Sequence, residues 1–151
     1  MDDQVRGFLK DEYFKLQDQY EDFDRRSLMI KGWVSAGAAI ALVAGMSGER
    51  SFAPQQWLVI AILVACFWFL EARWKQFQYA TRGRIVELEA FFRNEGGPQP
   101  KPLQIYQRWF ATYRDPKTRV ALWRCAFQDF VMLPYVLIVA ICVVAAVAPQ
   151  S

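Results

Sequence analysis

Residues 130–148 read FVMLPYVLIVAICVVAAVA, a run of 19 residues without a charged or amide side chain. An α-helix needs about 20 mainly apolar residues to cross the roughly 30 Å hydrocarbon core of a bilayer. Two further stretches, Leu28–Met46 and Trp57–Leu70, reach this length with their flanks. Core helices of a soluble protein are the alternative, and it is weakest for 130–148. We therefore predict an all-α membrane protein with three transmembrane helices.

The prediction divides the chain into seven parts. They are an amphipathic helix at 1–25, spans at 26–47, 54–72 and 129–148, a short loop at 48–53, a helical segment at 73–128 and a tail at 149–151. Lys31 falls inside the first span but near its edge, where we expect its ammonium to reach the lipid headgroups.

The distribution of Lys and Arg orients the chain across the membrane. The loop after the first span contains only Arg50, whereas the segment at 73–128 contains eleven basic residues. Basic segments stay on the cytoplasmic side. We therefore expect the N-terminus and 73–128 inside, and the loop and C-terminus outside. The first 24 residues carry eight acidic side chains, which argues against a secretory signal peptide.

The expected cytoplasmic segment folds back on itself at 96–102. This stretch reads GGPQPKP, which cannot continue a helix. Before it, Glu71–Asn94 reads as a helix that continues out of the second span. After it, Leu103–Tyr113 is a second helix, and a third piece, Lys117–Gln128, leads into the last span. The segment is therefore predicted to be a helical hairpin.

The composition disfavours an enzyme. The chain has no histidine, which removes histidine triads, histidine bases and histidine-ligated metals. Cys66, Cys125 and Cys142 lie far apart and fit neither a metal site nor a disulfide framework. We expect no catalytic residue, no metal and no cofactor.

The N-terminal helix carries an apolar seam spaced as in a coiled coil. Its residues are Leu9, Tyr13, Leu16, Tyr20 and Phe23, at intervals of 4, 3, 4 and 3. This seam predicts either self-association of several subunits or packing on the chain's own cytoplasmic hairpin, and two heptads leave both open.

Charge is divided unequally between two segments that we expect on the same side of the membrane. Residues 1–24 have a net charge of −5, and residues 71–128 have a net charge of +6. Oppositely charged surfaces can dock. An anionic ligand that competes with the acidic helix for the basic surface would provide gating. The alternative is that the positive charge only fixes topology.

Aromatic residues alternate with the basic ones in this segment. Phosphate neutralisation combined with base stacking is how proteins hold nucleotides or single-stranded nucleic acid. The predicted ligand-binding residues are Arg82, Arg84, Arg93, Arg108, Arg114, Lys117, Arg119, Tyr106, Trp109 and Tyr113. Core aromatics with solvated arginines are the simpler alternative.

The spans suggest packing or a pore rather than transport. Gly37, Ala41 and Gly45 form a ladder of small residues that lets helices approach closely. Pro134 is a candidate hinge in the third span. No predicted span has an ionisable residue at its centre, which argues against a proton-coupled transporter and is compatible with an apolar gate.

The layout resembles small membrane effectors of bacterial anti-phage nucleotide-signalling systems, closest to the Hailong family of channel effectors. The resemblance rests on the pre-span segment Glu21–Ser27, the small-residue first span and the helix Glu71–Asn94. It implies a homotetramer in the inner membrane, a single-stranded DNA or nucleotide ligand, a nucleotidyltransferase partner and a role in antiviral defence. Two-span SLATT-type effectors are similar to a lesser degree, since this chain has a third span.

These features predict a homo-oligomeric ion channel controlled by a phosphate-rich ligand. The alternative is a non-conducting membrane scaffold that recruits a partner protein through its N-terminal helix.

Overall fold

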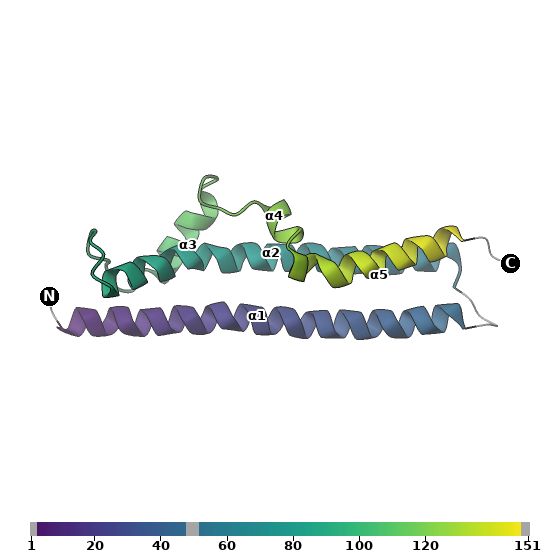
Figure 1. The fold of residues 1–151 in the computed structure, drawn as a ribbon, viewed down its shortest axis with the longest axis horizontal. Helices are drawn as coiled ribbons and strands as arrows, with labels where there is room; N and C mark the ends of the chain where they lie inside the picture. The colour runs from purple at the N-terminus through teal and green to yellow at the C-terminus, as the bar shows by residue number, and fades with distance from the viewer. Residues whose placement is uncertain (1–2, 48–51, 149–151) are drawn as a thin grey trace. The chain divides into compact units, whose positions relative to one another are not determined.

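The computed structural model describes residues 3–47 and 52–148, which contain five helices and no strand. The helices are α1 (Asp3–Met46), α2 (Pro54–Phe92), α3 (Ile105–Arg114), α4 (Leu122–Ala126) and α5 (Asp129–Val147) (Figure 1). Three of them, α1, α2 and α5, are long and apolar enough to cross a membrane. This confirms the prediction of an all-helical chain with three candidate spans.

The described chain separates into two compact units. The polar unit contains residues 3–25 and 74–121, and the apolar unit contains 26–47, 52–73 and 122–148. Both long helices contribute to both units. With 44 and 39 residues, α1 and α2 are each roughly twice as long as a bilayer core requires, at about 1.5 Å per residue. The predicted N-terminal helix and first span therefore form one uninterrupted helix.

Local sequence accounts for both ends of α2. Pro54 occupies the first helical position, where its missing N–H costs nothing. The Ala53 N–H donates to the Gln56 side-chain oxygen at 2.8 Å, which caps the start. After the helix, Asn94 adopts a left-handed conformation (φ 57°), and Gly96 and Gly97 also have positive φ. Such residues terminate a helix and reverse the chain.

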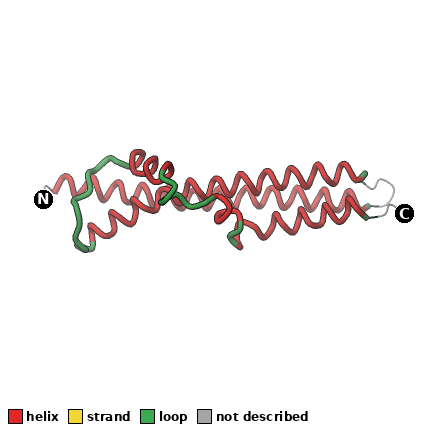
Figure 2. Tube along the Cα trace, turned by 90° about the horizontal axis from the view of Figure 1, so that it is seen from above, coloured by secondary structure: helices red, strands yellow, loops and turns green. Residues whose placement is uncertain are grey.

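The apolar unit is a bundle of three helical stretches. The end of α1, the start of α2 and α5 run side by side in both views (Figures 1 and 2). Their shared core consists of Ala38, Trp57, Ala61, Val64, Tyr135, Ile138 and Cys142. Most other large side chains of these helices point outward, as expected for surfaces that face lipid.

The polar unit pairs the start of α1 with the end of α2. Leu9 and Leu16 pack against Ile85 and Leu88, and all four side chains are buried. The third predicted helical piece, Lys117–Gln128, is shorter than expected, because only Leu122–Ala126 is helical and 115–121 is not. The predicted loop at 48–53 lies mostly outside the described residues, and the tail at 149–151 lies wholly outside them.

Candidate functional site

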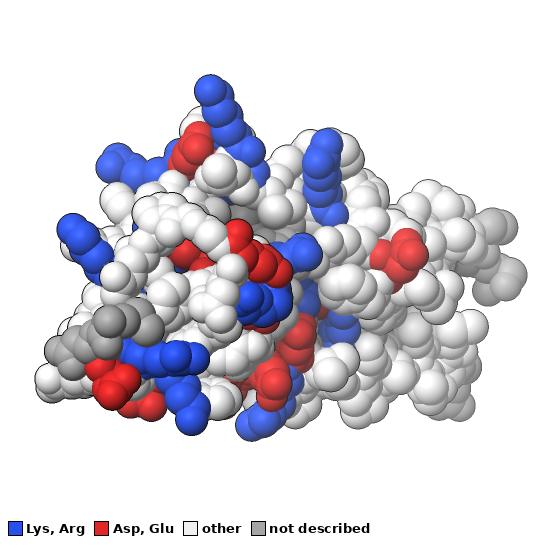
Figure 3. Space-filling view, turned by 60° about the vertical axis from the view of Figure 1, so that its left-hand side comes forward, with Lys and Arg blue, Asp and Glu red and all other residues white. Residues whose placement is uncertain are grey.

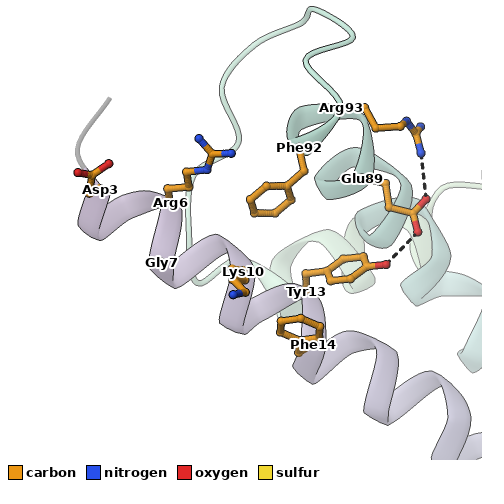
Figure 4. A pocket seen from close by; sticks show the side chains of 9 residues that line it. All are labelled: Asp3, Arg6, Gly7, Lys10, Tyr13, Phe14, Glu89, Phe92 and Arg93. Atoms are coloured by element: carbon orange, nitrogen blue, oxygen red, sulfur yellow. Dashed lines mark hydrogen bonds and ion pairs between the residues drawn. The ribbon is translucent and has the colours of Figure 1, made fainter.

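The polar unit contains a cavity of about 780 Å³, between the start of α1 and the end of α2 (Figure 4). Arg6 and Lys10 line it from α1, and Arg93 lines it from the residue that follows α2. The rings of Phe14 and Phe92 lie among these cations. The cavity therefore combines positive charge with aromatic surface.

Cations stack on both rings of this cavity. The Arg6 guanidinium lies 6.0 Å from the centroid of the Phe92 ring, and the Lys10 ammonium lies 5.8 Å from that of Phe14. Among the described residues, neither Arg6 nor Lys10 forms an ion pair. We therefore treat both cations as candidates for contact with an anion.

The carboxylate of Glu89, at one edge of the cavity, is already compensated. The Tyr13 hydroxyl donates a hydrogen bond to it at 3.3 Å, and Arg93 Nη1 lies 3.7 Å from its other oxygen. Arg93 also donates to Glu95 at 2.5 and 3.1 Å. These bonds lower the pKa of the Glu95 carboxyl and raise the pKa of Arg93. Both side chains are exposed, so the pair is easily exchanged for another partner.

A second cationic surface lies on α3, where three predicted ligand residues form a stack. The rings of Trp109 and Tyr113 are parallel within 5°, with centroids 5.2 Å apart. Tyr106 stacks on Trp109 at 6.2 Å and is 70% exposed. Trp109 also donates its indole N–H to the backbone oxygen of Phe77 at 3.1 Å, which ties the stack to α2. The stack is therefore partly structural and partly open.

Two exposed arginines lie against aromatic rings of α3. Arg114 lies over Phe110 and Arg119 over Tyr113, at 5.1 and 5.9 Å from the ring centroids. Arg82 and Lys117 are also exposed, whereas the exposed Arg108 is paired with Glu87 at 2.8 Å. Lys and Arg side chains accordingly project from several points of the polar unit in Figure 3. We name Tyr106, Trp109, Tyr113, Arg114, Lys117 and Arg119 the α3 surface.

Arg84 does not belong to either surface. It is 2% exposed, and its guanidinium lies 2.8 Å from Glu12 and 3.1 Å from Glu87. It also donates to the backbone oxygen of Lys101 at 2.7 Å. Burial lowers the pKa of Arg84, but the bonds to Glu12 and Glu87 outweigh this effect and raise it. We therefore reassign Arg84 from ligand binding to holding α1, α2 and the following loop together.

The apolar seam of the N-terminal helix is used within the chain. Leu9 and Leu16 are fully buried against α2, and Tyr13 and Tyr20 pack on the same cluster. Phe23 contacts the edge of Trp74, with ring centroids 5.3 Å apart. The sequence left open whether this seam joins several subunits or packs within the chain. In the structure, it packs on the chain's own α2.

The ladder of small residues in α1 is divided between two environments. A Cβ atom on Gly45 would lie 2.6 Å from side-chain atoms of Phe52 and Trp57, so close packing requires glycine there. A Cβ atom on Gly37 would meet nothing within 4 Å. Gly37 and Ala41 line an apolar groove of about 480 Å³ between α1 and α2.

Sequence reasoning missed a polar cluster in the apolar unit. Lys31 does not extend toward headgroups: its side chain is 13% exposed, and its ammonium lies 2.8 Å from Glu71, which is buried. Ser27 donates to the same Glu71 oxygen at 2.6 Å. Lys31 also donates to the backbone oxygen of Phe130. Ser27 and Lys31 are one helical turn apart, so their side chains lie on the same face of α1. This spacing is the feature of the sequence that could have indicated the cluster.

Pro134 explains why the Phe130 carbonyl accepts this bond. A proline inside a helix has no N–H, so the carbonyl four residues earlier loses its helical partner. In α5 that carbonyl belongs to Phe130, and the Lys31 ammonium takes the vacant place. The proline predicted as a hinge thus supplies a contact between α1 and α5.

The described residues contain no group of three or more Cys, Asp or Glu side chains that could hold a metal ion. The sequence matches no protein-family model, and neither a curated protein nor a solved structure is significantly similar to it.

Proposed function

We propose that the chain forms a homo-oligomeric ion channel in a bacterial inner membrane, controlled by a phosphate-rich ligand such as a nucleotide signal or a single-stranded oligodeoxynucleotide. The observation that carries this proposal is the α3 surface, where exposed cations lie beside stacked aromatic rings in a chain with three candidate spans. An extended polyanion can follow such a surface, with phosphates on the cations and bases on the rings.

Several copies are needed for a pore, because the core of one copy is filled. Trp57 and Tyr135 are nearly or fully buried in the core of the three-helix bundle. The groove lined by Gly37 and Ala41 offers a place where a helix of a second copy can approach closely. An ion path would then run between copies.

The proposed orientation places the polar unit in the cytoplasm and the C-terminus in the periplasm, because the basic residues concentrate in the polar unit. The resemblance of the layout to anti-phage effectors leads us to propose three further properties. They are a tetrameric state, a nucleotidyltransferase that makes the signal, and a role in defence.

Conductance in planar bilayers tests this proposal. Purified protein should conduct, and short single-stranded DNA should change the current at low salt and much less at high salt. The variant Arg114→Glu/Lys117→Glu/Arg119→Glu should lose the response but keep the oligomeric mass. Lys15→Glu, an exposed reversal outside the α3 surface, is the control. An oligomer that stays silent with and without DNA would refute the channel.

A non-conducting scaffold is the second candidate, and one observation favours it. Phe8 and Phe14 project from α1 with 44% and 52% of their surface exposed, although the buried seam is on the same helix. Exposed aromatic residues of this kind suit contact with a partner protein. A monomer in detergent, together with a partner that co-purifies in equal ratio and is lost in Phe8→Ser/Phe14→Ser, would support this function over the channel.

A further inference from the structure

We propose that the cavity between the start of α1 and the end of α2 binds a small aromatic phosphate, meaning a phosphate group attached to a planar ring system, as in a mononucleotide. The role of such a ligand in gating rests on the proposed channel function. The site of this ligand is different, since it lies outside the α3 surface. It uses Arg6, Lys10, Phe14 and Phe92, to which the sequence assigned no role, together with Arg93, a predicted ligand residue.

The charge of the cavity favours a dianion. Arg6 and Lys10 are one helical turn apart, and both line the cavity from α1. Arg93 lines it from the other wall, with its guanidinium turned toward Glu89 (Figure 4). The Glu89 carboxylate is occupied by the Tyr13 hydroxyl and Arg93. Asp3 lies at the outer end of the cavity, beyond Arg6 (Figure 4). A phosphate carries about −1.5 to −2 charges at neutral pH and three acceptor oxygens, which suits Arg6 and Lys10, and Arg93 joins them only by giving up its bonds to Glu95.

The rings of the cavity supply the second half of the site. Phe92 and Phe14 each carry a cation over one face. A planar ring that stacks on either phenylalanine therefore places its attached phosphate beside that cation. A free phosphate would use only the charges, and a neutral ring would use only the stacking. A compound with both parts uses the cavity fully.

Gly7 leaves the wall of α1 open between these groups. A Cβ atom built on it would meet nothing within 4 Å. A larger apolar side chain at this position would add to the lining of the cavity without changing its charge. Gly7→Leu is therefore a variant that blocks the site while the fold persists.

The position of the cavity connects binding to the spans. Its walls belong to α1 and α2, and each of these helices continues without a break into a candidate span. A ligand that contacts Arg6, Lys10 and Arg93 together joins the two helices and stabilises their pairing. Arg93 would exchange its exposed bonds to Glu95 for bonds to the phosphate.

Equilibrium dialysis with the full chain in detergent tests the site. The probes are deoxyadenosine monophosphate, deoxycytidine monophosphate, deoxyadenosine and inorganic phosphate. We expect both mononucleotides to bind, and the nucleoside and phosphate to bind at least about tenfold more weakly, because each lacks one half of the interaction. Arg6→Glu/Lys10→Glu and Gly7→Leu should each weaken mononucleotide binding by about tenfold or more.

The matched control is Lys15→Glu/Lys101→Glu, which reverses the same number of exposed charges outside both the cavity and the α3 surface. It should leave mononucleotide binding unchanged. Thermal unfolding of every variant verifies that the fold persists. Absence of mononucleotide binding, equal binding of inorganic phosphate, or a loss of binding only in the control variant would each overturn the inference.

The two proposals fail separately. Mononucleotide binding that depends on Arg6 and Lys10 but leaves bilayer conductance unchanged supports the cavity and refutes its role in gating. A current that responds to DNA in Arg6→Glu/Lys10→Glu, but not in the α3-surface variant, supports the channel and refutes the cavity as its control site.

Discussion

The guanidinium of Arg84 and the carboxylate of Glu12 form a buried ion pair between α2 and α1. Arg84 Nε lies 2.8 Å from Glu12 Oε1, and each side chain is 1% exposed. The other oxygen of Glu12 accepts the backbone N–H of Leu103 at 2.8 Å. One carboxylate therefore fixes two helices and the end of the loop that leads to α3.

Removing one partner of this pair should destabilise the polar unit. Arg84→Met leaves the Glu12 charge buried without its main partner, and we expect a loss of about 3–5 kcal/mol in the free energy of unfolding. The double variant Arg84→Met/Glu12→Leu should recover much of it, since no charge is left unpaired. Thermal or denaturant unfolding in detergent measures both. Arg93→Met, at an exposed pair, is the control and should change little.

Two glycines of α1 should respond oppositely to alanine. Gly45→Ala places a methyl group 2.6 Å from the Trp57 ring, so we expect a loss of about 1–3 kcal/mol from overpacking. Gly37→Ala meets no neighbour within the chain and should leave the monomer's unfolding midpoint unchanged or slightly raised. A fall in oligomeric mass in Gly37→Ala alone would identify the groove as a contact between copies. Equal destabilisation by both variants would contradict this assignment.

The sequence was sufficient for the spans and for part of the polar unit. Residues 130–148 predict a span without knowledge of any neighbour, because length and apolarity are properties of the segment alone. Among the described residues, the ion pairs of Glu12 with Arg84 and of Asp24 with Lys75 join the acidic helix to the basic segment.

The sequence does not show which basic residues form ion pairs with the acidic helix. Arg84 and Glu12 are 72 positions apart, and the pairing depends on which face of each helix is turned inward. Arg82, two residues earlier, points outward and remains exposed. The cavity was hidden for a related reason: Arg6 and Lys10 belong to a segment whose net charge is negative. Net charge over a segment does not describe one face of a helix.

Tyr20 should make the polar unit less stable at high pH. Burial of the phenol, together with the nearby Tyr79 and Asp24, raises the pKa of Tyr20 above its usual 10.0, against a smaller opposing effect of Arg82. Above pH 10 the unfolded chain therefore loses this proton before the folded chain does. The free energy of unfolding then falls as pH rises, up to the raised pKa.

Tyr20→Phe removes this contribution, so its unfolding midpoint should decline less steeply above pH 10 than that of the unmodified chain. Tyr106→Phe alters an exposed tyrosine and serves as the control. Identical slopes for the unmodified chain and Tyr20→Phe would show that the Tyr20 hydroxyl is solvated.

The cluster around Glu71 should behave as one unit that joins the three spans. Glu71 on α2 pairs with Lys31 and Ser27 on α1, and Lys31 reaches the Phe130 carbonyl that Pro134 leaves open on α5. Glu71→Gln removes the counter-charge of Lys31 in a low-dielectric surrounding, so we expect a loss of about 3–5 kcal/mol. Lys31→Met/Glu71→Gln should be more stable than Glu71→Gln alone, because the uncompensated charge is gone.

Pro134→Ala separates the two roles of Lys31. Alanine restores the helical N–H that bonds to the Phe130 carbonyl, so the ammonium loses this acceptor but keeps Glu71. We expect Pro134→Ala to change stability little by itself and to reduce the coupling between α1 and α5. A double-mutant cycle of Pro134→Ala and Lys31→Met, with unfolding followed in detergent, measures that coupling. Additive effects of the two changes would mean that the proline contributes nothing to the contact, and that Glu71 alone holds Lys31 in the bundle.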